Sequence, residues 1–412
     1  MAEHAIFDLI DQHAAGVGLE DLDRLGAMRM APSELAQLNV LDPFSQEYRQ
    51  ICEALYLRIS QRSQYNPKND ENSGLGESPD IWRGVTPFSF QASRFMSEFL
   101  ISWAAIFEAL DMTQGQSILE YGPGSGQILL MLARCGMASY GVDIDQDSLA
   151  VVRRQSEAMG LGVSLEQNEF GKGFAGQRFD RILFYEAFHH ALNFDSLLLG
   201  LHDRLKPGGK LLLAGEPVAA PGESAIPYPW GPRMDGLSLF CIRRRGWMEL
   251  GFQSDFFVKL MMRCGWTVRF QPSPVYRANV YVAEPMPERL MLGAEMTLPE
   301  GWSGPEGAHR WTIGTDAEAP LASATITLPI LRWKRLDLQI ELANFLGESK
   351  QVTLIAGDIS RAVTLESGQT ATIDLRGVTA PDLLIQTSTT VLPNDPRPLG
   401  IAVRHCVITP SA

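Results

Sequence analysis

The sequence predicts an α/β protein: a doubly wound, mostly parallel sheet, preceded by an N-terminal helical region and followed by a C-terminal antiparallel β-sandwich. Three observations predict this order. Short apolar runs alternate with helical patterns from Ser117 to about Pro285, as in parallel α/β folds. The first of these runs ends in a glycine-rich turn that opens a helix. Past Pro285 the helical periodicity stops, and short alternating runs are separated by Gly, Pro, Asn and Asp.

The N-terminal region, residues 1–80, is predicted to be helical and to end in a surface loop. Apolar residues recur at helical spacing around Ile6 and again around Ile51. The stretch Gln61–Asp80 is polar and rich in Asn, Ser, Gly and Pro, which favours a loop. A helix over Gln91–Leu110 is expected to lead into the sheet.

The middle of the chain, residues 81–285, is predicted to hold a Rossmann-like sheet, whose ligands bind at the carboxyl ends of the strands. Strands are expected, in order, at Ser117–Tyr121, Tyr140–Asp143, Val163–Glu169, Phe179–Glu186 and Lys210–Glu216, with further strands near Trp266 and Tyr281. Helices are expected over Gln127–Cys135, Asp147–Met159, Ser196–Leu205 and Ser254–Cys264.

Composition narrows the class of protein. A chain of 412 residues suits two or three domains, and 45% hydrophobic with 20% charged residues is typical of a soluble globular protein. The formal net charge of -13 argues against nucleic acid as the main partner, because phosphate binding requires a basic face. The most apolar stretch, Ile128–Val142, is interrupted by Arg134 and is too short for a membrane span, so none is expected.

The cysteines and the N-terminus favour a reducing compartment. The cysteines are scattered, odd in number and form no C-x-x-C pair, so neither a disulfide framework nor a zinc site is predicted. The N-terminus carries acidic residues where a signal peptide needs a basic and then an apolar run. A cytoplasmic location is therefore expected. The five cysteines are Cys52, Cys135, Cys241, Cys264 and Cys406.

The segment Glu120–Gly126, which reads Glu-Tyr-Gly-Pro-Gly-Ser-Gly, is the strongest functional signal. Its glycines let the backbone turn sharply and let a ligand come close. The amides at the start of the following helix favour a carboxylate or a phosphate. The spacing is G-x-G-x-G, and Gln127 stands where a dinucleotide site carries its third glycine, which argues against NAD or FAD.

Two further segments extend this signal. Asp143 ends the next predicted strand, roughly 20 residues on, where a ribose-binding acid is expected. Asn168-Glu169-Phe170 follows the third strand, where an acid or its neighbouring backbone can meet an adenine amine. The alternative is purely structural: the glycine turn serves only strand-to-helix geometry, and Asp143 caps the following helix.

Four segments in order resemble the successive motifs of the class I S-adenosylmethionine-dependent methyltransferases. They are Glu120–Gly126, Gly141–Ile144, Phe179–Glu186 and Leu205–Lys210, and the resemblance covers about Gly115–Glu216. It implies S-adenosyl-L-methionine as cofactor and methyl transfer as reaction, and it says little about the substrate.

The resemblance also implies which residues bind the cofactor. Glu120, Gly122 and Gly124 would line its methionine end, Asp143 would bind ribose in preference to Asp145, and Glu169 with Phe170 would flank adenine. The complete implied set is Glu120, Tyr121, Gly122, Gly124, Gly126, Asp143, Glu169 and Phe170.

The catalytic candidates follow the fourth predicted strand, in a segment that reaches the transferring methyl in this superfamily. A neutral imidazole of His189 or His190 can take the proton of an acceptor hydroxyl, because histidine titrates near neutral pH. Alternatively these histidines only shape the pocket, and Glu186 is the second candidate. Proximity and exclusion of water can supply most of the acceleration of an in-line displacement. A metal-assisted mechanism is an open alternative, but no metal site is predicted, since no acid pair in these loops marks one.

The connection 217–251 between the fifth strand and the next helix is far longer than the few residues an α/β unit needs, which predicts a substrate lid. Aromatic faces beside arginines suit a sugar or phosphorylated acceptor. Alternatively, Gly236–Arg245 is a helix whose arginines favour its C-terminal dipole. Trp82 and Phe88 either close the cofactor pocket or pack the N-terminal helices. The acceptor candidates are Tyr228, Trp230, Arg233, Arg243 and Trp247.

The C-terminal region, residues 286–412, carries no paired acids or metal cluster, so a binding or assembly module is expected, or one that docks on the catalytic domain. Its turns at Gly304–Gly307 and Asp395–Gly400 loosely resemble β-sandwich modules attached to bacterial enzymes of surface-polysaccharide synthesis. Strands are expected at Ala324–Leu328, Leu336–Leu342, Gln351–Ala356, Thr370–Leu375, Leu383–Thr387 and Ile401–Ile408.

The predicted function is O-methylation of a sugar or glycan precursor in cell-surface polysaccharide biosynthesis. The alternatives are methylation of a small secondary metabolite and a non-catalytic scaffold built on a cofactor fold. The expected partners are a small-molecule or glycan acceptor and either a second copy of the chain or enzymes of glycan synthesis.

Overall fold

The structure is a computed structural model that describes residues 3–12, 28–72, 93–315 and 320–411. The chain divides into two compact units. The first comprises Met1–Phe257 and Gln271–Val282, and the second comprises Val258–Phe270 and Ala283–Ala412. None of the described helices has both the length and the apolar character that a membrane crossing requires. Trp82 and Phe88 lie outside the described residues.

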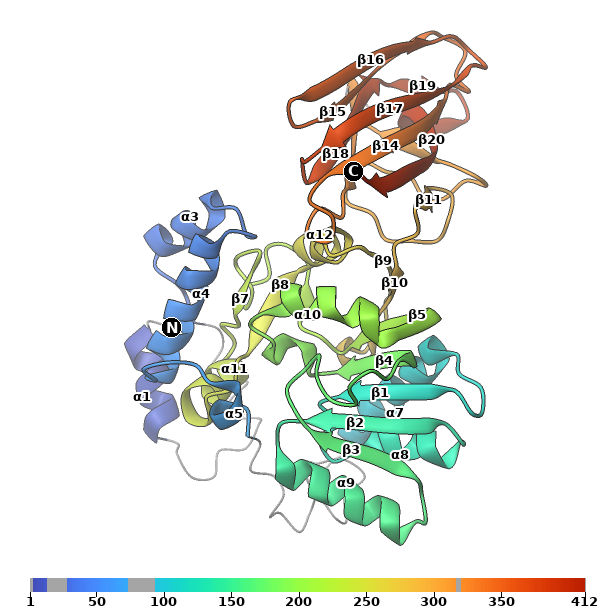
Figure 1. Cartoon of the computed structure of the whole chain (residues 1–412). Helices are drawn as coiled ribbons and strands as arrows, with labels where there is room; N and C mark the ends of the chain where they lie inside the picture. The colour runs from blue at the N-terminus through green and yellow to red at the C-terminus, as the bar shows by residue number, and fades with distance from the viewer. Residues whose placement is uncertain (1–2, 13–27, 73–92, 316–319, 412) are drawn as a thin grey trace. The chain divides into compact units, whose positions relative to one another are not determined.

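A seven-stranded, mostly parallel sheet has the strand order β3-β2-β1-β4-β5-β10-β9 (Figure 1). The neighbouring pairs β3/β2, β2/β1, β1/β4 and β4/β5 all run parallel. All five residues of β1 are buried, because helices cover the sheet, and parallel strands buried on both faces read as continuous apolar runs. The strands are β1 Ser117–Tyr121, β2 Ala138–Asp143, β3 Val163–Gln167, β4 Phe179–Tyr185, β5 Leu205–Ala214, β9 Trp266–Gln271 and β10 Val280–Pro285.

The helices around this sheet follow the predicted alternation. They are α7 Ser93–Leu110, α8 Gln127–Arg134, α9 Gln146–Ala158, α10 Phe194–Leu201 and α12 Ser254–Arg263. The helix α7 buries Phe99, Trp103 and Ile106 in one core cluster with Ile118 of β1 and Leu183 of β4. Because β1 and α8 are locked into this core, the turn between them is held on a rigid scaffold.

The N-terminal helices and the long connection after β5 pack together in the first unit. The Tyr48 hydroxyl donates to the Trp230 carbonyl at 2.8 Å, and Arg243 Nε donates to Asp11 Oδ1 at 2.7 Å. The helices are α1 Glu3–Gln12, α3 Pro32–Val40, α4 Gln46–Ser60 and α5 Pro67–Asp70. The connection forms a small sheet of β6 Val218–Ala219, β7 Trp230–Pro232 and β8 Leu250–Gln253, with α11 Gly236–Phe240 and a π-helical turn Cys241–Arg245.

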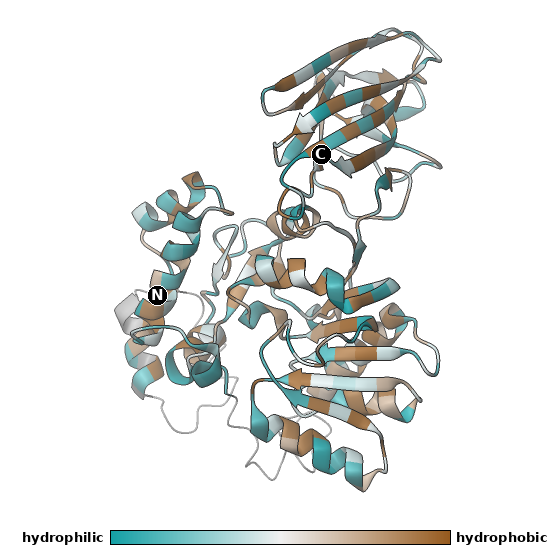
Figure 2. Ribbon diagram, viewed as in Figure 1, coloured by the Kyte–Doolittle hydropathy of each residue, from teal (hydrophilic) through white to brown (hydrophobic). Residues whose placement is uncertain are grey.

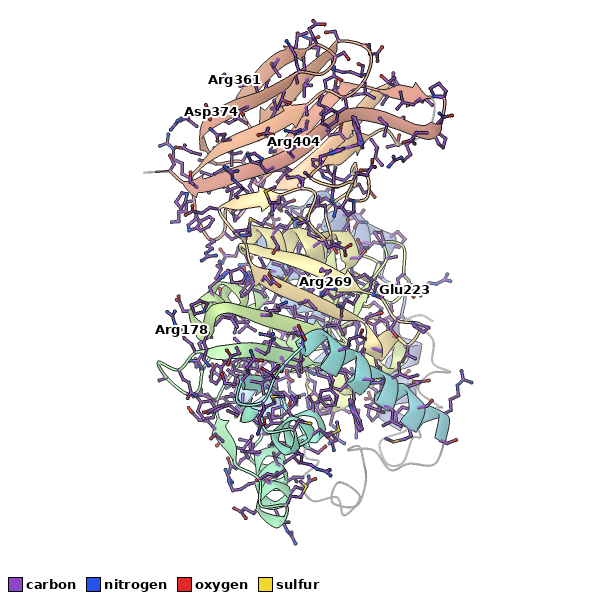
Figure 3. All side chains as sticks on the ribbon, turned by 90° about the vertical axis from the view of Figure 1, so that its right-hand side faces the viewer. Arg178, Glu223, Arg269, Arg361, Asp374 and Arg404 are labelled. Atoms are coloured by element: carbon purple, nitrogen blue, oxygen red, sulfur yellow. The ribbon has the colours of Figure 1, made fainter. Side chains whose placement is uncertain are left out.

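The C-terminal region consists of antiparallel strands that form one six-stranded and one four-stranded sheet. Hydrophobic and hydrophilic residues alternate along these strands in Figure 2, as expected where one face is buried. Gly400 shows how closely the sheets approach: a Cβ there would lie 2.5 Å from Ala322 and 2.8 Å from Thr387, which belong to the other sheet. Arg361 on β16, Asp374 on β17 and Arg404 on β20 are labelled in Figure 3.

The strands of this region extend and add to the predicted ones. They are β11 Arg289–Met291, β12 Arg310–Ile313, β13 Leu321–Thr327, β14 Leu336–Ala343, β15 Lys350–Ala356, β16 Ile359–Leu365, β17 Thr370–Val378, β18 Asp382–Ser388, β19 Thr390–Leu392 and β20 Asp395–Pro410. The strand β16 was not predicted because most of its residues are half-buried or exposed, which removes the apolar alternation. The signal that does exist is the two-residue Gly357-Asp358 hairpin turn, with Gly357 at a φ of 60°.

Candidate active site

The glycine turn between β1 and α8 forms part of the wall of a cavity of about 1060 Å³. Gly122 and Gly124 have φ values of 69° and 51°, in the left-handed region that glycine adopts without strain. A Cβ on Gly122 would lie 2.9 Å from Ala187, whereas a Cβ on Gly124 would meet nothing within 4 Å. Gly122 is therefore required for packing, and Gly124 faces open space that a ligand can fill.

Gly126, the third glycine, has a different role from the one implied by the resemblance. It precedes α8 as its N-cap with a φ of 80°, and a Cβ there would lie 2.8 Å from Val152. It is not among the residues that line either cavity described here. Gly126 lets the turn pack against α9, and its contact with the cofactor stays a prediction.

Glu120 and its neighbour Tyr121 point in different directions. Glu120 is 3% exposed and lines the large cavity, and its Oε2 is buried without a hydrogen-bond partner. Burial raises the pKa of Glu120 to about 8. Tyr121 is fully buried, its ring stacks on Phe184 at 5.0 Å, and its hydroxyl donates to the Lys172 carbonyl at 3.1 Å. The side chain of Tyr121 thus belongs to the core, which leaves only its backbone for the predicted contact with the cofactor.

Asp143, at the carboxyl end of β2, lines a second cavity of about 350 Å³ together with Gly122 and Gly124. Its Oδ1 accepts from the amide of Asp145 at 2.9 Å, and burial raises its pKa to about 6. The carboxylate of Asp145 instead caps α9, since it accepts from the Asp147 amide and the Ser148 hydroxyl at 3.0 and 2.8 Å. This division of roles fits the preference for Asp143 over Asp145 as ribose partner.

Glu169 and Phe170 also line the second cavity. The Phe170 ring packs edge-on against Tyr121 and lies 3.6 Å from the Cβ position of Gly122. The Glu169 carboxylate accepts from Lys172 Nζ at 2.6 Å, which lowers its pKa. Phe170 therefore contributes an apolar side chain to the wall of the second cavity, and Glu169 contributes an ionised carboxylate.

His189 lines the large cavity and is held by Glu216, which follows β5. The ring Nδ1 lies 2.9 Å from Glu216 Oε2, and that carboxylate also accepts from the amides of Ala187, Phe188 and His189 at 2.9–3.1 Å. Burial lowers the pKa of His189 well below its usual value and raises that of Glu216 to about 7. The ring is thus fixed in position and neutral.

His190 lines both cavities and faces a carboxylate from the N-terminal region. Its Nδ1 lies 3.1 Å from Glu71 Oε2, an ion-pair distance without the direction of a hydrogen bond. Glu71 Oε1 accepts from the Tyr65 hydroxyl at 2.8 Å and from the Met248 amide at 2.7 Å. Burial lowers the pKa of His190, but the carboxylates, with Glu71 first among them, outweigh it and raise the pKa to about 9.

Glu249 and Glu186 are two further carboxylates that line the large cavity. Glu249 Oε2 lies 3.6 Å from His189 Nε2 and accepts from Arg233 at 2.6 Å. Burial raises the pKa of Glu249, but Arg233 and the histidines outweigh it and lower the pKa. Glu186 is paired with Arg277 and has a φ of 49°, which is strained for a residue with a Cβ. Such strain at a residue that lines both cavities favours a functional position.

Comparison with known proteins assigns the sheet region. Residues 119–213 match the family described as a methyltransferase domain. This chain carries a methyltransferase domain. Its predicted cofactor, S-adenosylmethionine, is confirmed together with the class of domain.

Relatives of the methyltransferase domain have varied names. An S-adenosyl-L-methionine-dependent Diels-Alderase of Talaromyces variabilis is 30% identical over 142 residues, which are 33% of this chain and 46% of that protein. A ubiquinone biosynthesis O-methyltransferase of Ruegeria pomeroyi is 33% identical over 96 residues, or 23% and 39%. The chain thus spans less than half the length of these relatives. The magnesium protoporphyrin IX methyltransferase of Synechocystis has a TM-score of 0.38 at 14% identity, covering 54% of this chain and 98% of that one.

The long connection contributes to the methyltransferase site through fewer residues than predicted. Trp247 lines both cavities, with its ring edge-on to His190 at 6.1 Å, and Arg233 lines the large one. Tyr228 and Trp230 are fully buried and line neither cavity. Arg243 binds Asp11 and the Ile59 carbonyl and lines neither cavity, so its acceptor role stays a prediction without support from these contacts. Trp230 and Arg243 hold the connection to the N-terminal helices, whereas the Tyr228 hydroxyl donates to the Pro232 carbonyl within the connection.

Several residues around the histidines were not predicted: Glu71, Glu216, Glu249 and Arg277. For Glu216 a signal was present, because it lies two residues after the end of β5, where the carboxyl ends of parallel strands meet. Glu71 and Glu249 are separated from the histidines by more than a hundred and by about sixty residues, and no local pattern marks them. Only the packing of the N-terminal region and of β8 brings them into the site.

Proposed function

We propose that this chain is an S-adenosylmethionine-dependent O-methyltransferase that methylates a hydroxyl of a sugar or glycan precursor. The observation that carries the proposal is the His189–Glu216 pair in the wall of a cavity that also contains the glycine turn. A cavity of about 1060 Å³ has room for a cofactor end and an acceptor side by side.

The residues around the glycine turn fit the cofactor. When bound, S-adenosylmethionine supplies a methyl group on a sulfonium that a nucleophile can displace. The unpaired Oε2 of Glu120 suits the ammonium group at its methionine end, since a cation beside a buried carboxyl favours the ionised form. Asp143 suits the ribose hydroxyls, Phe170 suits the face of adenine, and Gly124 leaves room for the chain between them.

His189 is the general base in this proposal. Glu216 accepts the Nδ1 proton of the ring, which fixes the tautomer and leaves the Nε2 lone pair to accept a proton. Nε2 takes the proton of the acceptor hydroxyl as its oxygen attacks the methyl carbon. Positioning of the hydroxyl against the methyl group contributes the remainder of the acceleration.

Polar groups favour a sugar as acceptor. The cavity wall carries Arg233, Arg245 and Glu249 beside the Trp247 ring, and such a set suits hydroxyl groups and the flat face of a sugar ring. In this proposal the C-terminal region is a β-sandwich that binds or assembles with other components of cell-surface polysaccharide synthesis in the cytoplasm.

A second candidate acceptor is a small apolar secondary metabolite. Phe95, Phe99, Leu237 and Phe240 line the same cavity, and together they form an apolar portion of its wall. A phenol or an apolar cyclic alcohol would bury more apolar surface against these side chains than a sugar would.

The test is an acceptor screen with the full chain and S-adenosylmethionine labelled in its methyl group. Nucleotide sugars and glycans form one panel, and phenols and apolar alcohols form the other. We expect a labelled methyl ether on a sugar hydroxyl. Label found only in the apolar panel would favour the second candidate. Bound cofactor without transfer to either panel would favour the non-catalytic scaffold.

A further inference from the structure

Two imidazoles and one carboxylate converge inside the large cavity. One ligating atom each of His189, His190 and Glu249 lie within 4.8 Å of one another. Of these atoms, His189 Nε2 and Glu249 Oε2 are 3.6 Å apart. Two atoms that share a metal ion at about 2.1 Å from each are separated by a little over 3 Å, so this spacing needs only a small adjustment.

The Nδ1 atom of each imidazole lies beside a separate carboxylate. Glu216 lies 2.9 Å from Nδ1 of His189, and Glu71 lies 3.1 Å from Nδ1 of His190. Metal-binding histidines typically donate their other ring N–H to a carboxylate, which fixes the tautomer and raises the basicity of the ligating nitrogen. Glu216 gives His189 this support, and Glu71 lies at an ion-pair distance from His190. A metal ion that takes the place of the His190 proton would therefore meet two Nε2 lone pairs.

The charge around the imidazoles also favours a cation. Glu71, Glu216 and Glu249 face the two rings, while Arg233 is the cation in contact with Glu249. Three carboxylates and one guanidinium leave a formal excess of about two negative charges in a buried region, which is costly in a low dielectric. A proton on His190 removes one of these charges, and a divalent ion removes both.

We propose that His189, His190 and Glu249 form a binding site for a divalent transition-metal ion. Two imidazoles and one carboxylate on one side of an ion leave positions open toward the cavity, and Zn²⁺ and Fe²⁺ are the ions that such a ligand set suits. In the metal-bound state, Nε2 of His189 ligates the ion and no longer serves as a base. An acceptor hydroxyl on an open position would then be activated by the ion, which lowers its pKa. This last step rests on the proposed function, whereas the binding site does not.

The experiment is a metal titration of the full chain after treatment with a chelator, without cofactor or acceptor. Co²⁺ is followed by its visible absorption and Zn²⁺ by calorimetry. We expect one equivalent of each to bind, and we expect Glu249→Gln and His190→Asn to weaken the binding by at least about tenfold. His309→Asn, in the C-terminal unit, is the matched control and should leave affinity unchanged.

Glu216→Gln tests the supporting carboxylate without removing a ligand. We expect it to weaken binding by roughly 10- to 100-fold. Circular dichroism and thermal melting identify any variant that fails to fold, and the remaining variants decide. The absence of stoichiometric binding, or equal binding by wild type and all folded site variants, would overturn the proposal. Because no cofactor is present, either result leaves the proposed methyl transfer to be judged separately.

Discussion

The two halves of the site are built in different ways. The cofactor half lies almost entirely in one continuous stretch from β1 to the end of β2, with Glu120, Gly122, Gly124 and Asp143 set by one turn and one strand end. The acceptor half collects Glu71, His189 and His190, Glu216 and Glu249 from four separate segments. In the proposed function, cofactor binding is therefore a local property of the chain, and the acceptor chemistry depends on tertiary packing.

The largest expected effect is on the acceptor half. His189→Ala removes the proposed base, so methyl transfer to an acceptor found in the screen should slow by roughly 10²- to 10⁴-fold. S-adenosylmethionine affinity should stay within about twofold, because the ring does not belong to the cofactor half. Single-turnover transfer and calorimetry give the two numbers. His202→Ala, a half-buried histidine of the same domain, is the control. An unchanged rate would remove His189 from the mechanism.

Gly124→Ala and Gly126→Ala divide the glycine turn into a binding and a packing position. At Gly124 a Cβ meets no protein atom but enters the proposed cofactor space, so we expect at least about tenfold weaker cofactor binding at a stability cost of about 1–2 kcal/mol. At Gly126 the Cβ meets Val152 at 2.8 Å, which adds overpacking of about 1–3 kcal/mol. The midpoint temperature of thermal unfolding should therefore be lower for Gly126→Ala than for Gly124→Ala. The reverse ranking in stability would contradict these assignments.

The sequence was sufficient for the local half of the site. The strand β1 was predicted to the residue, and Glu120, Gly122 and Gly124 line a cavity because the turn leaves few alternatives. Within that turn, however, Tyr121 and Gly126 face the core. A motif specifies the backbone path, but the partner helix and strand decide which side each residue faces.

The distant half was only partly predictable. His189 and His190 were found because they follow a strand of the parallel sheet. Tyr228, Trp230 and Arg243 line neither cavity, and the sequence could not indicate this because aromatic and basic residues occur both in substrate lids and in packing contacts. Here Tyr48 and Asp11 of the N-terminal helices hold Trp230 and Arg243.

A pH titration sharpens the cofactor half further. Burial raises the pKa of Asp143 to about 6, and only its ionised form accepts from both ribose hydroxyls. Cofactor affinity should therefore be highest above pH 7 and fall as the pH drops through 6, by up to about tenfold per pH unit. Asp143→Asn should bind more weakly at pH 8 and show a flatter profile. Calorimetry from pH 5 to 8 checks both, and a wild-type profile that is level across this range would exclude the ribose role.

The smallest effect is expected for Tyr121→Phe. This change removes the hydrogen bond to the Lys172 carbonyl and keeps the ring stacked on Phe184, so stability should fall by about 0.5–1.5 kcal/mol. Cofactor affinity should not change, because the hydroxyl points away from both cavities. A clear loss of affinity, measured in the same calorimeter, would return Tyr121 to the cofactor site.

The most direct test of the central claim is calorimetric titration of the full chain with S-adenosylmethionine and, separately, with NAD. Binding of the first at one site and no binding of the second is the predicted result, since the turn lacks the third glycine of a dinucleotide site. Binding of NAD, or of neither compound at millimolar concentration, would contradict the assignment of this pocket to a methyl donor.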